Sequence, residues 1–399
     1  MTSETPTAVW MPAAPKPGAI SFAILFAVES FARAVVSAVV SVQAYDLLKS
    51  GQHVSLLFTI VGLFVPLGTL LVPILHHFMP RRWVYTTGVL LLIVASLCFA
   101  SFTLFGQAAG MYLRVLGTAV LNITLSLYIL DHIRRVELVR SEPLRLSFSV
   151  VSWTVGPYLG IWLYAQYGHA APQIAAIIGA VVLLVIFWYL RLSTNPAISA
   201  GPARPVSPWA SIGRFIAQPR LRLAWLIAFG RSCFWSSFFI YAPLLMIEGG
   251  LGKEAGGMLL SAGNAVLILA VVFGRIAERT SVRQVIVWSF GVGAAASLAA
   301  GLAGTEAPLL AASMLFIGSI AASSLDGVGG IPFMRAVKGR ERAAMTGVYR
   351  TYIDFSDLIP SLVFSVALGF FGLGVVFIIL AVWLAIVGLM AWIYLPRSM

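Results

Sequence analysis

Long apolar runs separated by short polar stretches dominate the pattern of hydrophobic and polar positions along this chain. A helix that crosses a membrane needs about 20 mostly apolar residues, and runs of that length are too continuous for the alternating strands of a membrane barrel. The pattern therefore predicts an all-α integral membrane protein with about twelve transmembrane helices. Their expected bounds are 19–43, 54–75, 83–105, 108–131, 145–166, 172–191, 223–246, 255–275, 284–304, 307–331, 344–370 and 374–395.

The longest polar interruption runs from Arg191 to Arg222 and separates the apolar runs into two sets of six. It is rich in arginine and proline and has no acidic residue, which is typical of an irregular connector on a membrane surface. Within it, Trp209 to Ala217 is expected to form a short amphipathic helix. Two similar apolar blocks around such a linker indicate a duplicated membrane unit. We expect a cytoplasmic tail at 1–18, six-helix bundles at 19–191 and 223–399, and a cytoplasmic linker at 192–222.

The composition agrees with a membrane protein, because 60% of the residues are hydrophobic, 10% are charged and the mean hydropathy is +0.96. A soluble domain has roughly 45–50% apolar and 25% charged residues. In a soluble protein the net charge of +12 would suggest nucleic acid as a partner. In a membrane protein the positions of the charges matter more than their sum, so no nucleic-acid partner is expected.

The lysines and arginines predict the orientation, because cytoplasmic loops retain positive charge. With the amino terminus in the cytoplasm, 21 of the 26 lie on the cytoplasmic side and only Lys49 and Lys253 lie on the other. The remaining three, Arg33, Arg114 and Arg231, fall inside predicted helices. We therefore expect both termini in the cytoplasm, and the protein in a bacterial-type cytoplasmic (inner) membrane. The first eighteen residues lack the pattern of a cleavable signal peptide.

A charged loop carries a resemblance to a known family. After the eighth apolar run the sequence reads Gly274, three residues, Glu278, Arg279 and then Arg283. This is similar to the G-x-x-x-D-R-x-G-R-R loop of the major facilitator superfamily, with Glu278 for Asp and Ser281 for the second Gly. One interpretation is a charge relay that forms in one state and releases in another. The simpler one is retention of positive charge on the cytoplasmic side with a single ion pair.

The first half has a degenerate copy of this loop. It keeps Arg81 and Arg82 at two of the family's positions. It has Pro73, His77 and Pro80 where Gly, Asp and Gly are usual, so the carboxylate of a relay is missing. Recurrence of the loop at the same place in both halves supports the duplication.

Two elements inside predicted helices extend the resemblance. Arg114-Val-Leu-Gly117 resembles the family's R-x-x-x-G element with one residue fewer. Gly156-Pro157-Tyr-Leu-Gly160 resembles the core of the G-P-x-x-G-G signature of proton-coupled exporters, without its final Gly. A purely structural kink at the proline is the alternative. The resemblance implies two pseudo-symmetric six-helix bundles that rock about a central cavity, in an exporter branch similar to the drug:proton antiporters.

The first predicted helix holds two opposite charges near its centre, Glu29 and Arg33. An ionisable group in mid-membrane costs about 2.5–3.5 kcal/mol on insertion scales, so each should face a cavity or a partner. The i, i+4 spacing, with the acid first, favours an ion pair. Either the two residues neutralise each other as a structural pair, or the pair lies in the cavity and opens when a proton or a substrate competes.

The eleventh predicted helix carries Arg350, Asp354 and Asp357 on one stripe. Two carboxylates one turn apart in a medium of low dielectric constant are costly to ionise together, so one of them is expected to take up a proton near neutral pH. These acids are our preferred site of proton coupling. In the alternative interpretation Arg350 neutralises Asp354, and Asp357 bonds to a neighbouring helix.

Two further arginines are candidate substrate ligands. Arg231 is followed by aromatic residues in the seventh predicted helix, where a guanidinium can clamp a carboxylate or phosphate or pair with Glu29 or Asp357. Arg114 lies in the outer half of the fourth, where it either enters the cavity or extends toward the membrane surface. Asp326 in the tenth is interpreted as a cap or gate residue.

These observations predict transport and no other chemistry. The sequence contains no phosphate-cradling G-x-x-x-x-G-K-S/T run, no G-x-S-x-G nucleophile motif and no metal-ligand spacing, so neither an enzyme nor a cofactor is expected. The expected function is proton-coupled export of a small amphipathic organic molecule by a protein that acts as a monomer in the lipid bilayer. The alternatives are a proton-coupled importer of an organic anion or siderophore-like solute, with Arg33 and Arg231 as clamps, and a membrane sensor on the same scaffold.

Overall fold

The computed structural model describes residues 19–69, 72, 75, 78–132, 135–190, 208–337 and 341–396. Within these ranges every regular element is a helix. The expected tail at 1–18, nearly all of the linker before Pro208, and two residues of the first charged loop, Pro73 and His77, lie outside the described residues.

The helices form two consecutive groups, which we call the first and the second group. The first group consists of α1 (Ala19–Val35), α2 (Ser37–Leu48), α3 (Gly51–Thr69), α5 (Arg81–Ala100), α6 (Leu104–His132), α7 (Arg135–Tyr167) and α8 (Ala170–Tyr189). The second consists of α9 (Pro208–Ile216), α10 (Pro219–Glu248), α11 (Gly252–Ala265), α12 (Ala270–Arg279), α13 (Val282–Ala303), α14 (Pro308–Val328), α15 (Ile331–Ala336), α16 (Arg342–Arg350), α17 (Tyr352–Ala367) and α18 (Gly374–Tyr394).

The predicted membrane helices correspond to these elements. Nine helical stretches in the described part of the chain are long and apolar enough to cross a membrane. Three further helices, α3, α7 and α17, stand at the second, fifth and eleventh predicted positions. Helix α17 is short because a break at Thr351 separates it from α16, and α7 is less apolar because it begins in a charged stretch. The fold class, an all-α membrane protein with the predicted arrangement of helices, is confirmed.

Three of the predicted apolar runs contain an irregularity that their pattern does not reveal. The first is divided at Val36 into α1 and α2, and the eighth contains a short 3₁₀ segment at Val266–Leu269 between α11 and α12. The eleventh is divided at Thr351 between α16 and α17. Breaks of this kind leave backbone groups free to bond elsewhere, and such backbone is tolerated at membrane depth only inside the protein.

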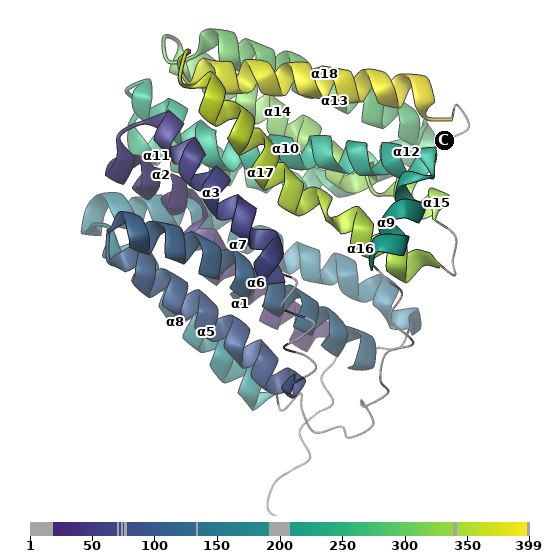
Figure 1. Cartoon of the computed structure of the whole chain (residues 1–399), viewed down its shortest axis with the longest axis horizontal. Coiled ribbons are helices and arrows are strands. Elements are labelled where there is room, and N and C mark those ends of the chain that lie inside the picture. Colours follow the sequence, from purple (N-terminus) through teal and green to yellow (C-terminus); the bar gives the residue numbers. More distant parts are fainter. Residues whose placement is uncertain are drawn as a thin grey trace, which may run out of the picture.

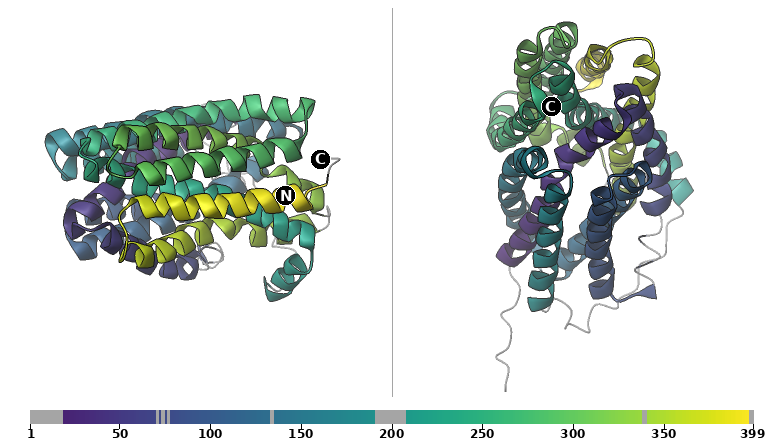
Figure 2. Two further views of the ribbon diagram at one scale, coloured as in Figure 1. Left: turned by 90° about the horizontal axis from the view of Figure 1, so that it is seen from above. Right: turned by 90° about the vertical axis from the view of Figure 1, so that its left-hand side faces the viewer.

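The two groups lie against each other and run along the long axis of the molecule (Figure 1, Figure 2). Within the first, α1 packs on α7 and α8, and α5 packs on α6; within the second, α13 packs on α14 and α18. Between them, α11 meets α7, α3 meets α17 and α2 meets α10. The turns that join α2 to α3 and α10 to α11 lie at one end of the molecule, on the left in Figure 1. We call this the closed end.

Candidate functional site

A cavity of about 290 Å³ lies between the two groups of helices, and both groups supply its walls. Its volume is at the lower end of the range for small-molecule sites. The first group contributes residues of α2, α3, α6 and α7, and the second contributes residues of α10 and α17. The lining consists of Ser37, Val40, Ser41, Phe58, Val61, Gly62, Val65, Met111, Arg114, Val115, Trp153, Ser232, Trp235, Ser236, Phe239, Ile240 and Asp357.

Aromatic rings form one part of the cavity wall. Trp153 of α7 and Phe239 of α10 meet edge to face across the two groups, with ring centroids 5.8 Å apart. Trp235, one turn before Phe239, adds a third ring, with 6.3 Å between the two centroids. Rings of this size contribute large apolar surface at small conformational cost, so the wall suits a molecule with an apolar or aromatic body.

Arg114 brings a positive charge to the cavity. Its Nη2 donates a hydrogen bond of 3.2 Å to the backbone carbonyl oxygen of Arg33, while its buried Nε has no hydrogen-bond partner among the described residues. No carboxylate in the described part of the chain lies within ion-pair distance of it. The guanidinium therefore has hydrogen-bonding capacity that the surrounding protein leaves unused.

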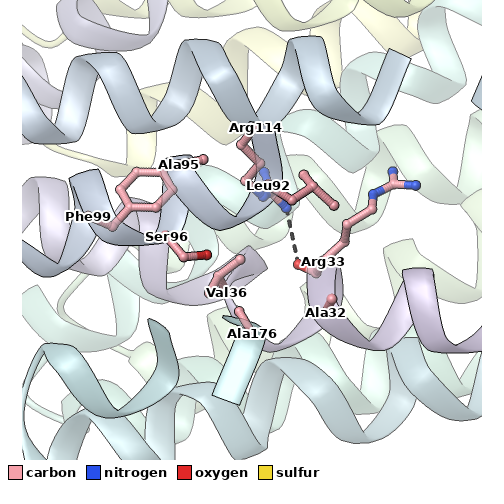
Figure 3. Close-up of a pocket in the computed structure, with 9 residues that line it drawn as sticks. All are labelled: Ala32, Arg33, Val36, Leu92, Ala95, Ser96, Phe99, Arg114 and Ala176. Carbon is pink, nitrogen blue, oxygen red and sulfur yellow. Dashed lines mark hydrogen bonds between the residues drawn. The ribbon is translucent and has the colours of Figure 1, made fainter. Parts of the chain in front are cut away.

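A second, much smaller pocket of about 10 Å³ lies on the other side of Arg114, bounded by α1, α5 and α8 (Figure 3). It has room for about one water molecule and is therefore no substrate site. Figure 3 shows Arg114 reaching the backbone of Arg33, whose own side chain extends away from it.

Asp357 of α17 brings a negative charge to the opposite wall. Its side chain is exposed to the cavity, and it accepts a hydrogen bond from the side chain of Ser236 on α10. Asp357 and Arg114 attract each other electrostatically without forming an ion pair. Asp354, one turn earlier, is half-buried and does not line the cavity. In the described chain no ion pair joins it to Arg350.

Glu29 and Arg33 form the ion pair that their spacing predicts. Arg33 Nη1 lies 3.1 Å from Glu29 Oε1, and Glu29 is completely buried. The Arg33 guanidinium also lies 5.9 Å from the centroid of the Trp153 ring. Neither charged residue lines the cavity, so the structure favours the interpretation of a structural pair next to the cavity wall.

Arg231 pairs within the second group, with Asp326 of α14, and not with Glu29 or Asp357. Its Nη1 lies 2.8 Å from Asp326 Oδ1, and its Nη2 donates to the Tyr352 hydroxyl at 3.0 Å. Trp235 Nε1 donates to the other Asp326 oxygen at 2.9 Å. The interpretation of Asp326 as a cap or gate residue therefore misses its main contact. The available signal was that Arg231 and Asp326 both lie inside predicted helices of the same half.

A polar cluster at the closed end joins the two groups. Asp46 of α2 accepts hydrogen bonds from Lys253 Nζ of α11 and from the Tyr164 hydroxyl of α7, each at 2.6 Å. Lys253 also lies 4.8 Å from the Tyr164 ring centroid. The sequence predicts Lys253 in a loop between helices, but it lies in the first turn of α11. Nothing in the sequence points to Asp46 and Tyr164, which are remote from it in the chain.

Further contacts reinforce the closed end. The Tyr45 hydroxyl donates to Glu248 Oε1 at 3.0 Å, and the Ser55 and Tyr241 hydroxyls lie 2.5 Å apart in the interior. Both of these hydrogen bonds connect the first group to the second. They lie between the cavity and the closed end, so they separate the cavity from that side of the molecule.

The Gly156-Pro157-Tyr-Leu-Gly160 element lies where α7 passes the break between α1 and α2. A Cβ atom at Gly160 would overlap the carbonyl oxygen of Val35, and one at Gly156 would lie 2.5 Å from the Ala34 Cβ. Helix α7 continues through Pro157, and the next amide, that of Tyr158, donates to the hydroxyl of Ser261 on α11 at 2.9 Å. The element thus combines close packing within one group with a hydrogen bond to the other.

The charged motif of the second half covers the end of α12, the turn at Thr280 and Ser281, and the start of α13. Glu278 and Arg279 are exposed, and in the described residues neither takes part in an ion pair. Arg283 Nη2 donates to the backbone carbonyl oxygen of Trp392 on α18 at 2.5 Å. Gly274 has open space where a Cβ atom would stand, so close packing does not require glycine there.

The part of the chain that the structure describes contains no group of three or more His, Cys, Asp or Glu side chains placed as metal ligands. The charged groups of the cavity, Arg114 and Asp357, can act as hydrogen-bond partners and counter-ions, and Asp357 can also accept a proton. The arrangement offers recognition of charge and exchange of a proton inside an otherwise apolar and aromatic space.

Comparison with known proteins places the chain in a family. A profile described as Major Facilitator Superfamily matches residues 22–351. A POT family transporter in complex with a thioalcohol-conjugated peptide has a similar structure, with 13% identity, a TM-score of 0.76, and coverage of 95% of this chain and 96% of the other. The nucleoside transporter NupG resembles it at 11% identity and a TM-score of 0.71, covering 95% of this chain and 99% of the other.

A bacterial homologue of the iron transporter ferroportin, in an inward-facing state, is similar at 15% identity and a TM-score of 0.68, with 94% of this chain and 98% of the other covered. No curated protein sequence matches the chain. The profile covers most of the chain, and the three similar structures described above are transporters, which indicates a transporter and not an enzyme. The chain belongs to the Major Facilitator Superfamily.

Proposed function

We propose that this protein is a proton-coupled secondary transporter that exports a small amphipathic organic molecule through the cavity between its two groups of helices. The family supports secondary transport in general. The coupling and the direction that we propose rest mainly on the cavity whose walls come from both groups and which holds Arg114, Asp357 and four aromatic side chains. A site shared between two bodies is accessible to one side or the other as the bodies move.

Asp357 is the proposed proton carrier. A carboxylate inside a membrane costs about 2.5–3.5 kcal/mol unless it is paired, and protonation removes that cost. Asp357 is exposed to the cavity and has no cationic partner among the described residues, so protons and solutes can both reach it. Asp354, further from the cavity, is the second candidate.

The contacts at the closed end are the proposed barrier on the outer side. The distribution of lysine and arginine supports an orientation with both termini in the cytoplasm of a bacterial-type inner membrane. In that orientation the closed end faces outward, and the cavity is loaded from the cytoplasm. Outward release then requires the contacts of Asp46 and Lys253 to break.

Two motifs are proposed to take part in this motion. Gly156, Pro157 and Gly160 hold α7 against the α1 break, and the Tyr158 amide ties the same stretch to α11. Gly274, Glu278, Arg279 and Arg283 lie at the junction of α12 and α13, from which charge contacts can be made in the other state. The absence of an ion pair at Glu278 in the described residues is consistent with a relay that is released in this state.

Import of an organic anion is the second candidate. It is favoured by Arg114, whose buried Nε has no hydrogen-bond partner in the described chain and which can clamp a carboxylate. Arg33 and Arg231, the clamps expected from the sequence, are already engaged by Glu29 and Asp326. The arginines alone therefore do not determine whether the solute is imported or exported. That direction depends on how solute movement is coupled to proton movement.

The test is proton flux in liposomes that contain the purified protein and a pH-sensitive dye. Candidate solutes are added under an imposed pH gradient, and a solute-dependent collapse of the gradient is expected. No solute-dependent flux under any gradient would instead support a membrane sensor. In whole cells, deletion of the gene for an exporter raises the internal level of the solute. Deletion of the gene for an importer abolishes growth on the solute as the sole nutrient source.

A further inference from the structure

We propose that the cavity binds a zwitterion, a small molecule with an anionic group for Arg114, a cationic group for Asp357 and an apolar or aromatic body between them. This inference rests on the proposed function, because it identifies the class of solute for the same cavity. It starts from a difference between these two charges and the other charges inside the bundle.

Three pairs of opposite charges in the described helices meet directly. Glu29 lies against Arg33 at 3.1 Å, and Arg231 lies against Asp326 at 2.8 Å. At the closed end Lys253 meets Asp46 at 2.6 Å. Such direct pairs are expected, because an isolated charge inside a membrane protein costs free energy.

Arg114 and Asp357 depart from this rule in the same cavity. In the described chain neither has an ion-pair partner, although each lines the cavity and the two attract each other electrostatically. They stand on α6 and α17, helices of opposite groups. Two unpaired opposite charges across one space call for a ligand that carries the complementary pair.

The hydrogen bonds around the two charges fix their roles. Arg114 is held by one bond to the Arg33 carbonyl oxygen, which leaves donors free for a carboxylate. Asp357 accepts a hydrogen bond from the side chain of Ser236 and lines the cavity, where a cationic group can reach it. A ligand with only an anionic group would satisfy Arg114 and leave Asp357 charged and alone unless a proton bound there.

The walls between the charges define the body of the ligand. Trp153, Trp235 and Phe239 supply aromatic surface, and Phe58 and Met111 add apolar surface. A cavity of about 290 Å³ accommodates a molecule of the size of an aromatic amino acid or a short peptide. A zwitterion of this kind touches both groups of helices at once, which links its binding to their relative motion.

The experiment compares matched ligands on the full chain in detergent by calorimetry. The probes are phenylalanine, N-acetylphenylalanine and phenylalaninamide, with alanylphenylalanine and its N-acetyl and amide forms as a second set. The three compounds of a set differ in which terminal charges they carry. The parent compound carries both, the N-acetyl form carries only the negative charge, and the amide carries only the positive charge. At least one zwitterion is expected to bind at least about tenfold more tightly than both of its singly charged relatives, the factor expected for one lost charged contact.

Two substitutions assign the ends of the ligand. Arg114→Gln should abolish the preference for the free carboxylate, so that the zwitterion and its amide bind alike. Asp357→Asn should abolish the preference for the free amine, so that the zwitterion and its N-acetyl form bind alike. Arg350→Gln makes the same chemical change as the first variant at an exposed arginine outside the cavity and should leave all affinities unchanged.

The inference is wrong if no zwitterion of either set binds, or if a singly charged relative binds as tightly as its zwitterion. These outcomes are separable from failure of the proposed function. If a singly charged solute drives proton flux, the proposal of a zwitterionic solute is wrong, and the proposal of proton-coupled transport is retained. If a zwitterion binds with the expected pattern but drives no proton flux, the proposal of proton-coupled transport is wrong, and the proposed binding site is retained.

Discussion

Asp46 and Lys253 join the two groups of helices at the closed end, with 2.6 Å between Asp46 Oδ2 and Lys253 Nζ. The same carboxylate oxygen accepts from the Tyr164 hydroxyl, so a single acid of α2 holds α7 and α11 together. Because the pair is partly shielded and charge-assisted, it is stronger than a surface ion pair. The Asp46–Lys253 pair is therefore the contact of the proposed barrier that a substitution tests most directly.

We predict that Asp46→Asn shifts the protein toward a state that is open at this end. The change removes the charge that holds Lys253 and weakens the bond to Tyr164. Distances between spin labels placed on α3 and α17 near the closed end should lengthen in a larger fraction of molecules. The exchange of the two residues, Asp46→Lys with Lys253→Asp, should restore part of the closed population.

Lys49→Met is the control for this prediction. Lys49 lies 3.7 Å from Asp46, but 73% of its side chain is exposed. An exposed pair contributes about 0–1 kcal/mol, so this variant should keep the distribution of the unsubstituted protein. An Asp46→Asn distribution identical to that of Lys49→Met would show that the pair is no barrier.

The packing of α7 on α1 predicts a strong effect of Gly160→Ala. The added methyl group would overlap the Val35 carbonyl oxygen, which is backbone and yields only if a helix moves. Overpacking of this kind typically costs about 1–3 kcal/mol. The measurement is the thermal unfolding midpoint of the purified protein, and a clear decrease is expected.

Gly274→Ala provides the matched comparison. Nothing lies within 4 Å of the position of its Cβ atom, and the residue is inside helix α12. Alanine is favoured over glycine in a helix by about 1 kcal/mol, so stability should stay equal or rise. Equal losses of stability in both variants would contradict the packing that the structure shows at Gly160.

The network around Arg231 predicts that Asp326→Asn destabilises the second group. The substitution leaves Arg231 without its counter-ion and weakens the hydrogen bond from Trp235. Loss of one partner of a buried pair costs about 3–5 kcal/mol, and the partial exposure of this pair places the expected loss at or below about 3 kcal/mol. A lower unfolding midpoint, together with changed tryptophan fluorescence, is the expected result.

Glu341→Gln serves as its control, because Glu341 pairs with Arg214 at 3.4 Å on the surface. An exposed pair contributes about 0–1 kcal/mol. A loss of stability no greater for Asp326→Asn than for this control would mean that the Arg231 network does not support the fold.

The sequence predicts the helices well because the need for apolar surface is a local property of each run. It also predicts the Glu29 and Arg33 pair, since both residues stand on one helix and the i, i+4 spacing fixes their separation. Asp357, which the sequence indicates as a candidate site residue, lines the cavity. Its role in proton coupling stays a prediction.

Relations between helices are less accessible to sequence analysis, because they depend on how each helix is rotated about its axis. Arg231 meets Asp326 on α14, a pairing that no spacing along the chain reveals. For the same reason nothing in the sequence indicates that Arg114 and Asp357 share a cavity or that Asp46 reaches Lys253. The breaks at Val36 and Thr351 lie inside apolar or mixed runs that read as continuous helices.

The proton-coupling role of Asp357 is tested most directly by comparing two modes of transport in liposomes, exchange of labelled for unlabelled solute and accumulation against a gradient. At solute concentrations high enough to offset its weaker binding, Asp357→Asn is expected to retain exchange, which needs no net proton movement, and to lose accumulation driven by a pH gradient. Asp354→Asn is expected to retain both, because Asp354 does not line the cavity. Full accumulation by the Asp357→Asn variant would contradict the account.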